Sequence, residues 1–185
     1  MEKNMRENFE NLERRVFDSL YNTDLERINY ELSKIDGPTL VSGVGGSSVV
    51  SEYASKILSN KNHIITRNTE PREFMYMDTN LYKNVLACSY SGNNYGVELA
   101  FLNNSKHYLL ASRENSKDDI TNLTYTCLDR EKSFISLAAT LIPCSILLNY
   151  YFGNNKERII DSLDSYNYDF DINCDAYEVF SGIET

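Results

Sequence analysis

The sequence predicts an α/β fold with a five-stranded parallel sheet, strand order 2-1-3-4-5, and helices on both faces. Short apolar runs alternate with segments of helical periodicity, a pattern typical of parallel strands that are covered on both sides. Two serine–glycine loops, at residues 43–48 and 88–94, each follow an apolar run and precede a helical segment. These observations together predict a three-layer αβα sandwich.

Each element follows from periodicity and from its flanking residues. Residues 1–35 carry apolar residues at three- and four-residue spacing, and we expect two helices there, the second capped by Asn22 or Thr23. Gly37 and Pro38 end this region, and Pro71 suits the first turn of a later helix. The expected strands are 39–43, 63–66, 84–89, 106–111 and 123–128, and the expected helices between them are 48–58, 71–80 and 95–103.

Residues 134–152 contain no charged side chain. Their length approaches that of a membrane-spanning helix. Polar residues and Pro143 interrupt the run, however, and no other segment resembles a membrane span. We therefore expect a buried helix that packs on the sheet or in a dimer interface, because a helix that is apolar all round is normally buried.

Composition excludes several classes of function. The chain has 185 residues and a formal net charge of −9, which argues against binding to nucleic acid or to an anionic membrane. Its four cysteines contain no Cys-x-x-Cys pair, which favours free thiols in a cytoplasmic protein over a metal or redox centre. The opening residues do not resemble a targeting segment. We expect no metal and no organic cofactor.

The two serine–glycine loops are expected to face one crevice. In the order 2-1-3-4-5 the carboxyl ends of the first and third strands flank the point where the chain reverses direction, and a crevice opens there. Helix N-termini offer unpaired N–H groups to an anion, and serine adds hydroxyl donors. The loops match neither a dinucleotide fingerprint nor a phosphate-binding loop that ends in Gly-Lys-Ser/Thr. The sequence therefore predicts an anion pocket of a different design.

The sequence pattern of these loops resembles that of the SIS (sugar isomerase) domain, a phosphosugar-binding module with a flavodoxin-like strand order. Residues 43–48 resemble its Gly-x-Gly-x-Ser turn, and residues 89–94 resemble its Ser-x-Ser-Gly-x-Thr phosphate loop, with Asn94 in place of threonine. The resemblance covers about residues 35–152. It implies phosphate contacts from eight residues: Gly45, Gly46, Ser47, Ser48, Ser89, Ser91, Gly92 and Asn94.

Residues 131–134 resemble the start of the long helix that lies beside the sugar in this family. The resemblance therefore implies that Lys132 and Ser133 lie on the sugar side, and it makes Glu131 a candidate base. Glu98 is expected to be a solvated helix residue. In two-domain members the principal base comes from a second SIS domain. Residues 177–185 resemble the opening strand and turn of such a domain.

We accordingly expect N-terminal helices at 1–36 and an SIS domain at 37–160. An acidic linker with the first strand of a second SIS domain is expected at 161–185. The expected function is phosphosugar binding in an aldose/ketose sugar-phosphate isomerase-like or deglycase-like enzyme whose principal base lies outside this chain. The alternative is a non-catalytic sugar-phosphate sensor. The expected partners are a sugar phosphate and either a second copy of the chain or a second SIS domain.

Overall fold

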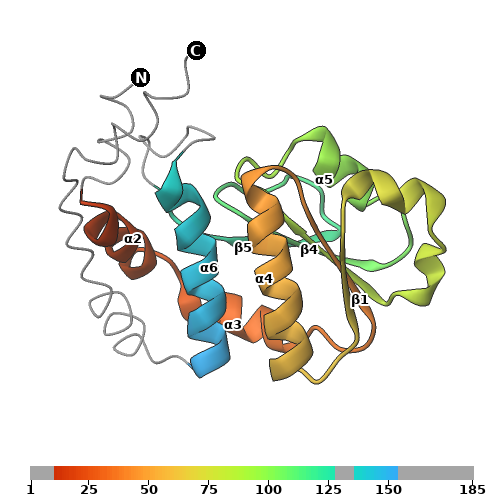
Figure 1. Ribbon diagram of the computed structural model, residues 1–185, viewed down its shortest axis with the longest axis horizontal. Helices are drawn as coiled ribbons and strands as arrows, with labels where there is room; N and C mark the ends of the chain where they lie inside the picture. Colours follow the sequence, from red (N-terminus) through yellow and green to blue (C-terminus); the bar gives the residue numbers. More distant parts are fainter. Residues whose placement is uncertain (1–10, 128–135, 154–185) are drawn as a thin grey trace, which may run out of the picture.

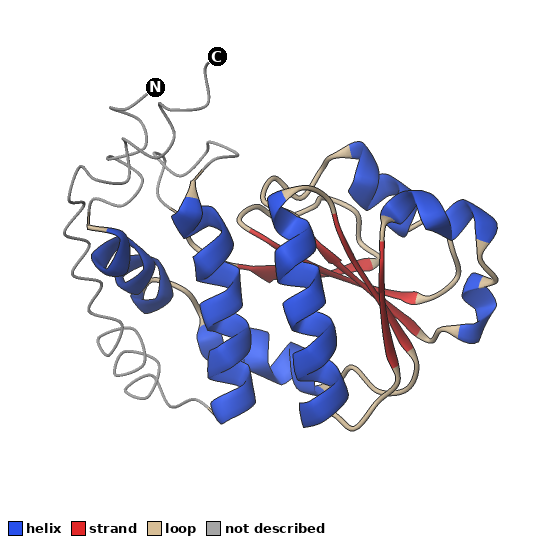
Figure 2. Cartoon of the chain, viewed as in Figure 1, coloured by secondary structure: helices blue, strands red, loops and turns tan. Residues whose placement is uncertain are grey.

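The computed structural model describes residues 11–127 and 136–153. Its sheet is parallel throughout, with the order β2-β1-β3-β4-β5 (Figures 1 and 2). The strands are β1 (Thr39–Gly43), β2 (Thr66–Thr69), β3 (Asn84–Cys88), β4 (Lys106–Ala111) and β5 (Ile120–Thr124). The predicted strand order and pairing are confirmed.

Helices cover both faces of this sheet. The four on one side are α2 (Leu12–Tyr21), α3 (Leu25–Ser33), α4 (Gly46–Lys61) and α6 (Leu137–Phe152). The other face is covered by the 3₁₀ helix η1 (Pro71–Tyr76) and by α5 (Tyr95–Ala100), and the short 3₁₀ helix η2 (Thr79–Leu81) leads on into β3. Figure 1 shows α4 and α6 running side by side in front of the sheet, and their contacts agree.

Alternation along the strands explains the two layers of core. On β3, Leu86 and Cys88 belong to the cluster under α4 and α6, whereas Val85 and Ala87 belong to the cluster under η1 and α5. Successive side chains of a strand point to opposite faces, so the apolar run from Val85 to Cys88 supplies both cores. The three-layer αβα sandwich is therefore confirmed.

The charge-free run at 134–152 forms α6, a helix of the core. Ile142, Ile146 and Leu147 are fully buried, and α6 packs mainly against α4 and α2. The expected burial is confirmed for its described part. Within residues 11–127 and 136–153, no helix combines the length and the apolar character needed to cross a membrane.

The second strand lies three residues later than the sequence suggested. Thr66–Thr69 pairs with Thr39–Ser42 of β1, while His63 has a positive φ of 54° and Ile65 is 73% exposed. β2 is an edge strand, and its bounds are set by hydrogen-bonded pairing with β1 and not by apolar side chains. The prediction of a strand at the apolar run 63–66 was therefore wrong in its bounds. β5, by contrast, begins three residues before the expected strand at 123–128, because Ile120 to Thr124 pair with His107 to Ala111.

Helix boundaries also differ at several points. Residues 71–81 form two 3₁₀ helices in place of one α-helix, α4 begins at Gly46 and runs to Lys61, and α5 ends at Ala100. The cap of α3 is Asp24, whose Oδ1 accepts a hydrogen bond from the Arg27 N–H at 3.0 Å. Thr23 is not that cap, because its hydroxyl instead donates to the Ser19 carbonyl.

Asn62 ties three helices together at the end of the core away from the loops. Its Nδ2 donates to the carbonyls of Leu32 and Ile35 at 3.0 and 2.9 Å, and its Oδ1 accepts from the Tyr150 hydroxyl. Asn62→Ala is expected to lower the free energy of unfolding by about 2 kcal/mol, since it leaves several polar groups without partners. Urea denaturation measures this.

The matched control is Asn60→Ala. Asn60 lies in the last turn of α4, just before the cap residue Asn62, and is exposed, and among the described residues its Nδ2 bonds to the Lys56 carbonyl one turn back. Its removal is expected to change stability by less than about 0.5 kcal/mol. Equal effects of the two substitutions would contradict the bridging role of Asn62.

Candidate functional site

A cavity of about 250 Å³ lies at the carboxyl ends of β1 and β3, between the starts of α4 and α6. Both serine–glycine loops line it, as the strand order predicted. The lining residues come from the first loop and α4, from the second loop, from β4 and the segment after β5, and from α6: Val44, Gly45, Gly46, Ser47, Val50, Cys88, Ser89, Tyr90, Ser91, Asn94, Leu110, Tyr125, Ser136, Ala139, Thr140 and Pro143.

The first loop makes a tight turn into α4. The Ser47 N–H donates to the Val44 carbonyl at 3.2 Å, and the Ser48 N–H donates to the Gly45 carbonyl at 2.9 Å. Gly46 opens the helix, so its N–H has no carbonyl one turn back in the helix to bind. The positive end of the α4 dipole therefore lies on the cavity wall.

Ser89 is the best-organised donor of the second loop. Its side chain is only 3% exposed, and its Oγ accepts hydrogen bonds from the Gly92 N–H at 3.2 Å and from Asn94 Nδ2 at 2.9 Å. An oxygen that already accepts twice is left with its own proton to donate. Because Ser89 lines the cavity, that proton is available to a ligand there.

Gly92 and Asn94 shape the loop. Gly92 has a φ of +76°, and an added Cβ would lie 2.7 Å from the Arg113 carbonyl oxygen, so glycine is required. Asn94 caps α5, because its Oδ1 accepts from the Val97 N–H at 3.0 Å while its Nδ2 binds Ser89. Asn94 thus uses both ends of its amide to organise the loop, although it still lines the cavity.

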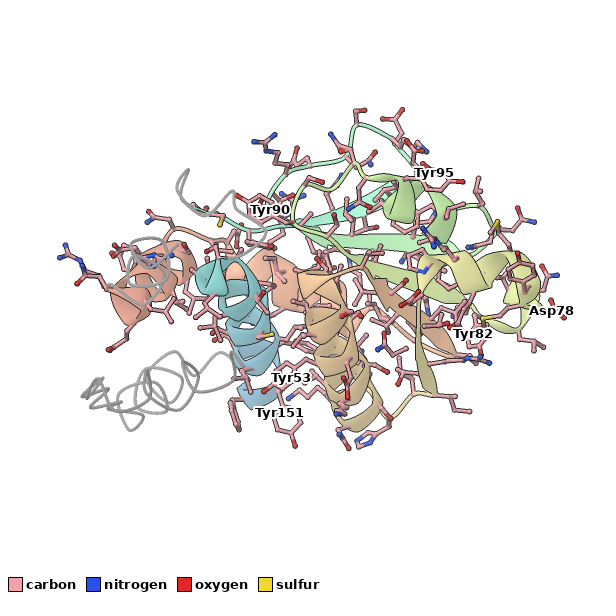
Figure 3. All side chains as sticks on the ribbon, turned by 45° about the horizontal axis from the view of Figure 1, so that its top comes forward. Tyr53, Asp78, Tyr82, Tyr90, Tyr95 and Tyr151 are labelled. Atoms are coloured by element: carbon pink, nitrogen blue, oxygen red, sulfur yellow. The ribbon has the colours of Figure 1, made fainter. Side chains whose placement is uncertain are left out.

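Tyr90 of the second loop also lines the cavity. Continued strand alternation would turn it away from Ser89 and Ser91, yet all three line the cavity. β3 ends at Cys88 and the chain then turns, so the alternation no longer applies. Burial raises the pKa of Tyr90 to about 12, which keeps its phenol protonated at neutral pH. In Figure 3, Tyr90 lies on the loop edge near the start of α6, and Tyr95 lies farther along at the start of α5.

Helix α6 supplies a third wall that the loop motifs do not reveal. Thr140 lies close to the start of α4, because a Cβ added to Gly46 would meet Thr140 Oγ1 at 3.4 Å. Ser136 and Thr140 are one turn apart and share the cavity-facing side of the helix. Four-residue spacing of hydroxyls in an otherwise apolar helix was the available signal for this wall.

Charged side chains are missing from the part of the lining that the structure describes, which contains no lysine, arginine, histidine, aspartate or glutamate. Hydroxyls and backbone N–H groups are therefore its main polar groups, and they suit an anion without a formal positive charge. No described group of three or more histidine, cysteine or acidic side chains is placed to hold a metal ion.

The remaining predicted site residues fall outside this lining. Ser48 is exposed, and its hydroxyl donates to the Gly45 carbonyl at 2.7 Å. Gly92 supports the loop through its N–H and carbonyl without lining the cavity. Glu98 is exposed on α5, as expected. Three predicted residues lie outside the described ones, as does the acidic segment at 161–185: Glu131, Lys132 and Ser133.

Cys88, which lines the cavity, and Cys144 of α6 are free thiols. Burial raises the pKa of the fully buried Cys88 strongly, and it raises the pKa of the half-buried Cys144 to about 11. A raised pKa keeps the thiol protonated, so both should resist iodoacetamide at pH 8 in the folded protein. Peptide mass spectrometry checks this against urea-unfolded chain, and alkylation of either at the unfolded rate would contradict it.

Comparison with solved structures shows what this architecture resembles. The structure of E. coli CFT073 c3406, in complex with a sugar phosphate, has a TM-score of 0.56 at 12% identity, over 80% of this chain and 89% of that one. A candidate sugar-phosphate isomerase from Listeria monocytogenes has a TM-score of 0.56 at 10% identity, over 86% and 96%. This chain has the SIS-type fold. The fold expected from the loop resemblance is thereby confirmed.

A third solved structure has the same SIS-type fold. The Vibrio vulnificus NanR protein complexed with ManNAc-6P has a TM-score of 0.54 at 18% identity, over 98% of this chain and 70% of that one. No protein-family model and no curated protein matches the sequence. At identities of 10 to 18%, the likeness establishes the SIS-type architecture of the chain, and the assignment of function rests on the cavity.

Proposed function

We propose that this SIS-type domain binds a sugar phosphate, with the phosphate group held between the start of α4 and the second loop. The observation that carries the proposal is the Ser89 hydroxyl, which accepts two hydrogen bonds inside the loop and keeps its own proton to donate to a ligand in the cavity. Ser47, Ser91 and the Gly46 N–H at the start of α4 line the same space. Several hydrogen-bond donors close together suit a phosphate group, because its oxygens are hydrogen-bond acceptors.

Two kinds of known protein with this fold support the sugar part of the proposal. The c3406 structure contains a sugar phosphate and the NanR structure contains ManNAc-6P, and a phosphate pocket of the same architecture would serve either ligand. We propose the phosphosugar-binding domain of an isomerase-like or deglycase-like enzyme. The principal base would come from outside the described lining, from Glu131 or from a further SIS domain.

A sensor role is the second candidate, and one observation favours it. Isomerisation between aldose and ketose requires a base that moves a proton between adjacent carbons, usually a carboxylate or a histidine. The described part of the cavity lining contains neither. A domain with this lining binds and reports a sugar phosphate without converting it, unless a base is added from elsewhere.

Thermal-shift measurement with a panel of sugar phosphates tests the binding proposal. The panel consists of glucose 6-phosphate, fructose 6-phosphate, glucosamine 6-phosphate, arabinose 5-phosphate and ManNAc-6P, each compared with its unphosphorylated sugar. At 100 times its dissociation constant, a true ligand stabilises the folded chain by about 2.7 kcal/mol, and the free sugars should give no shift. A panel without any shift would overturn the phosphosugar proposal.

An isomerase assay of the same chain, with the panel member that binds, then separates the two roles. Turnover that disappears in Glu131→Gln while binding persists supports the enzyme. Binding without turnover, both in this chain and in a preparation that includes any further SIS domain encoded with it, supports the sensor.

A further inference from the structure

The segment between β4 and β5 holds the backbone of the second loop, although that segment supplies none of the cavity lining. The Tyr90 carbonyl accepts hydrogen bonds from the Ser112 N–H at 3.1 Å and from the Ser112 hydroxyl at 2.7 Å. The Gly92 carbonyl accepts a hydrogen bond from Asn115 Nδ2 at 3.0 Å. Two carbonyls of the loop, one on each side of Ser91, are therefore fixed from outside the site.

Asn115 is itself held in place by β5. Its N–H donates to Asn122 Oδ1 at 2.8 Å, and its carbonyl accepts from Asn122 Nδ2 at 3.0 Å. The Oδ1 of Asn115 accepts from the Lys117 N–H at 3.1 Å and so closes the turn. These bonds occupy the backbone of Asn115 and one end of its amide, and they leave Nδ2 to donate to the Gly92 carbonyl.

Gly92 needs such an anchor because its own backbone is easily rotated. A Cβ at this position would lie 2.7 Å from the Arg113 carbonyl oxygen, so glycine is required, yet glycine loses more conformational freedom on ordering than any other residue. The Gly92 N–H donates to Ser89 Oγ at 3.2 Å, while the Gly92 carbonyl accepts from Asn115. The bond from Asn115 therefore restrains the same residue that orients the Ser89 hydroxyl.

We infer that Asn115 is a positioning residue of the phosphate site, which acts on the ligand through Gly92 and Ser89 without touching it. The inference rests on the proposed function and adds to it a contact outside the cavity on which affinity depends. While Asn115 holds Gly92, Ser89 Oγ keeps both of its donors, and its own proton is left for the ligand. Without Asn115, Gly92 rotates, and Ser89 Oγ loses one of the two hydrogen bonds that orient it.

Asn115→Ala tests this role, and Asn103→Ala is its matched control. Asn103 lies before β4, at the end of the strand away from the cavity, and makes the same kinds of local bond as Asn115. Its Nδ2 donates to the Ala100 carbonyl at 2.8 Å, and its Oδ1 accepts from the Ser105 N–H at 2.9 Å. Asn103 also contacts the His107 ring, so its loss should lower the urea midpoint at least as much. Only Asn115→Ala should weaken binding.

Isothermal titration calorimetry with the sugar phosphate of the five-member panel that binds wild type measures the effect on affinity. Asn115→Ala should weaken binding three- to tenfold, whereas Asn103→Ala should stay within twofold of wild type. In the Ser89→Ala background, Asn115→Ala should change affinity by less than twofold, because the hydroxyl through which it acts is gone.

Hydrogen exchange followed by NMR tests the restraint on Gly92 directly. The Gly92 N–H should exchange at least tenfold faster in Asn115→Ala than in wild type, because its bond to Ser89 Oγ opens more often. In Asn103→Ala its exchange should stay within twofold of wild type. An unchanged rate in Asn115→Ala would overturn the inference.

The binding outcomes separate the inference from the proposed function. If no sugar phosphate of the panel binds wild type, the proposed function fails, and the inference fails with it. If one binds wild type and Asn115→Ala binds it equally tightly, the proposed function stands and the inference is overturned. Equal losses of affinity in Asn115→Ala and Asn103→Ala would assign the effect to stability. A loss that persists in the Ser89→Ala background would assign it to another part of the loop. Either result also overturns the inference.

Discussion

Replacing Ser89 and Ser91 together by alanine is expected to abolish the stabilisation by sugar phosphates, with a fall in affinity of at least about 100-fold. Hydrogen bonds to charged groups contribute about 1.5–3 kcal/mol each, and the double variant removes two hydroxyls that line the cavity. Calorimetric titration of the sugar phosphate that binds wild type measures the loss.

The single variants are expected to differ in a way that the structure explains. Ser89→Ala removes the acceptor of the buried Gly92 N–H and of the Asn94 amide, so it should also lower the free energy of unfolding by about 1–3 kcal/mol. Ser91 has no such partner among the described residues, so Ser91→Ala should weaken binding at unchanged stability. Urea denaturation distinguishes the two.

Ser48→Ala is the matched control. Ser48 lies beside the first loop, but its hydroxyl is exposed and bonded to the Gly45 carbonyl, outside the cavity lining. Its affinity for the sugar phosphate should stay within about twofold of wild type. Wild-type affinity in the double Ser89/Ser91 variant would contradict the placement of the phosphate, whereas a large loss in Ser48→Ala would move the phosphate to the other side of the first loop.

Gly43→Ala is expected to destabilise the fold more than Asn62→Ala and at least as much as Ser89→Ala. A Cβ at this position would lie 2.2 Å from the Ser47 carbonyl oxygen and 2.6 Å from its carbon, and both are backbone atoms of the first turn of α4. β1 holds Gly43 in the sheet, and α4 holds the Ser47 carbonyl. Neither group can therefore move away from the clash without displacing the loop between them. We expect a loss of about 3 kcal/mol, a fall of roughly 6–12 °C in the unfolding temperature.

Gly46→Ala is the control for this clash. Its added Cβ would meet only Thr140 Oγ1, at the ordinary contact distance of 3.4 Å, so stability should change by less than about 0.5 kcal/mol. Because Gly46 lines the cavity, sugar-phosphate binding should still weaken. Differential scanning calorimetry of both variants is the measurement. A wild-type unfolding temperature for Gly43→Ala would contradict the described approach of β1 to α4.

Strands that contain a run of apolar residues were predictable from the sequence. β1 at 39–43 and β4 at 106–111 matched their expected bounds, because each central strand carries consecutive apolar residues, Leu40 and Val41 in β1 and residues 108–111 in β4. β2 did not match, since an edge strand is defined by pairing with its neighbour. The prediction of an α-helix at 71–80 was also wrong, because proline suits the start of an α-helix and of a 3₁₀ helix alike.

The strand order is predictable from the chain alone, as are the two buried faces of the sheet and the meeting of two serine–glycine loops at one edge. These follow from local periodicity and from connectivity rules, which need no knowledge of distant contacts. Which hydroxyls share the cavity depends on the three-dimensional packing. It brought Thr140 of α6 against the start of α4, placed Tyr90 beside Ser89, and moved Ser48 outside the lining. The reason is physical: how α6 packs on α4 and where β3 ends depend on contacts between residues far apart in the chain.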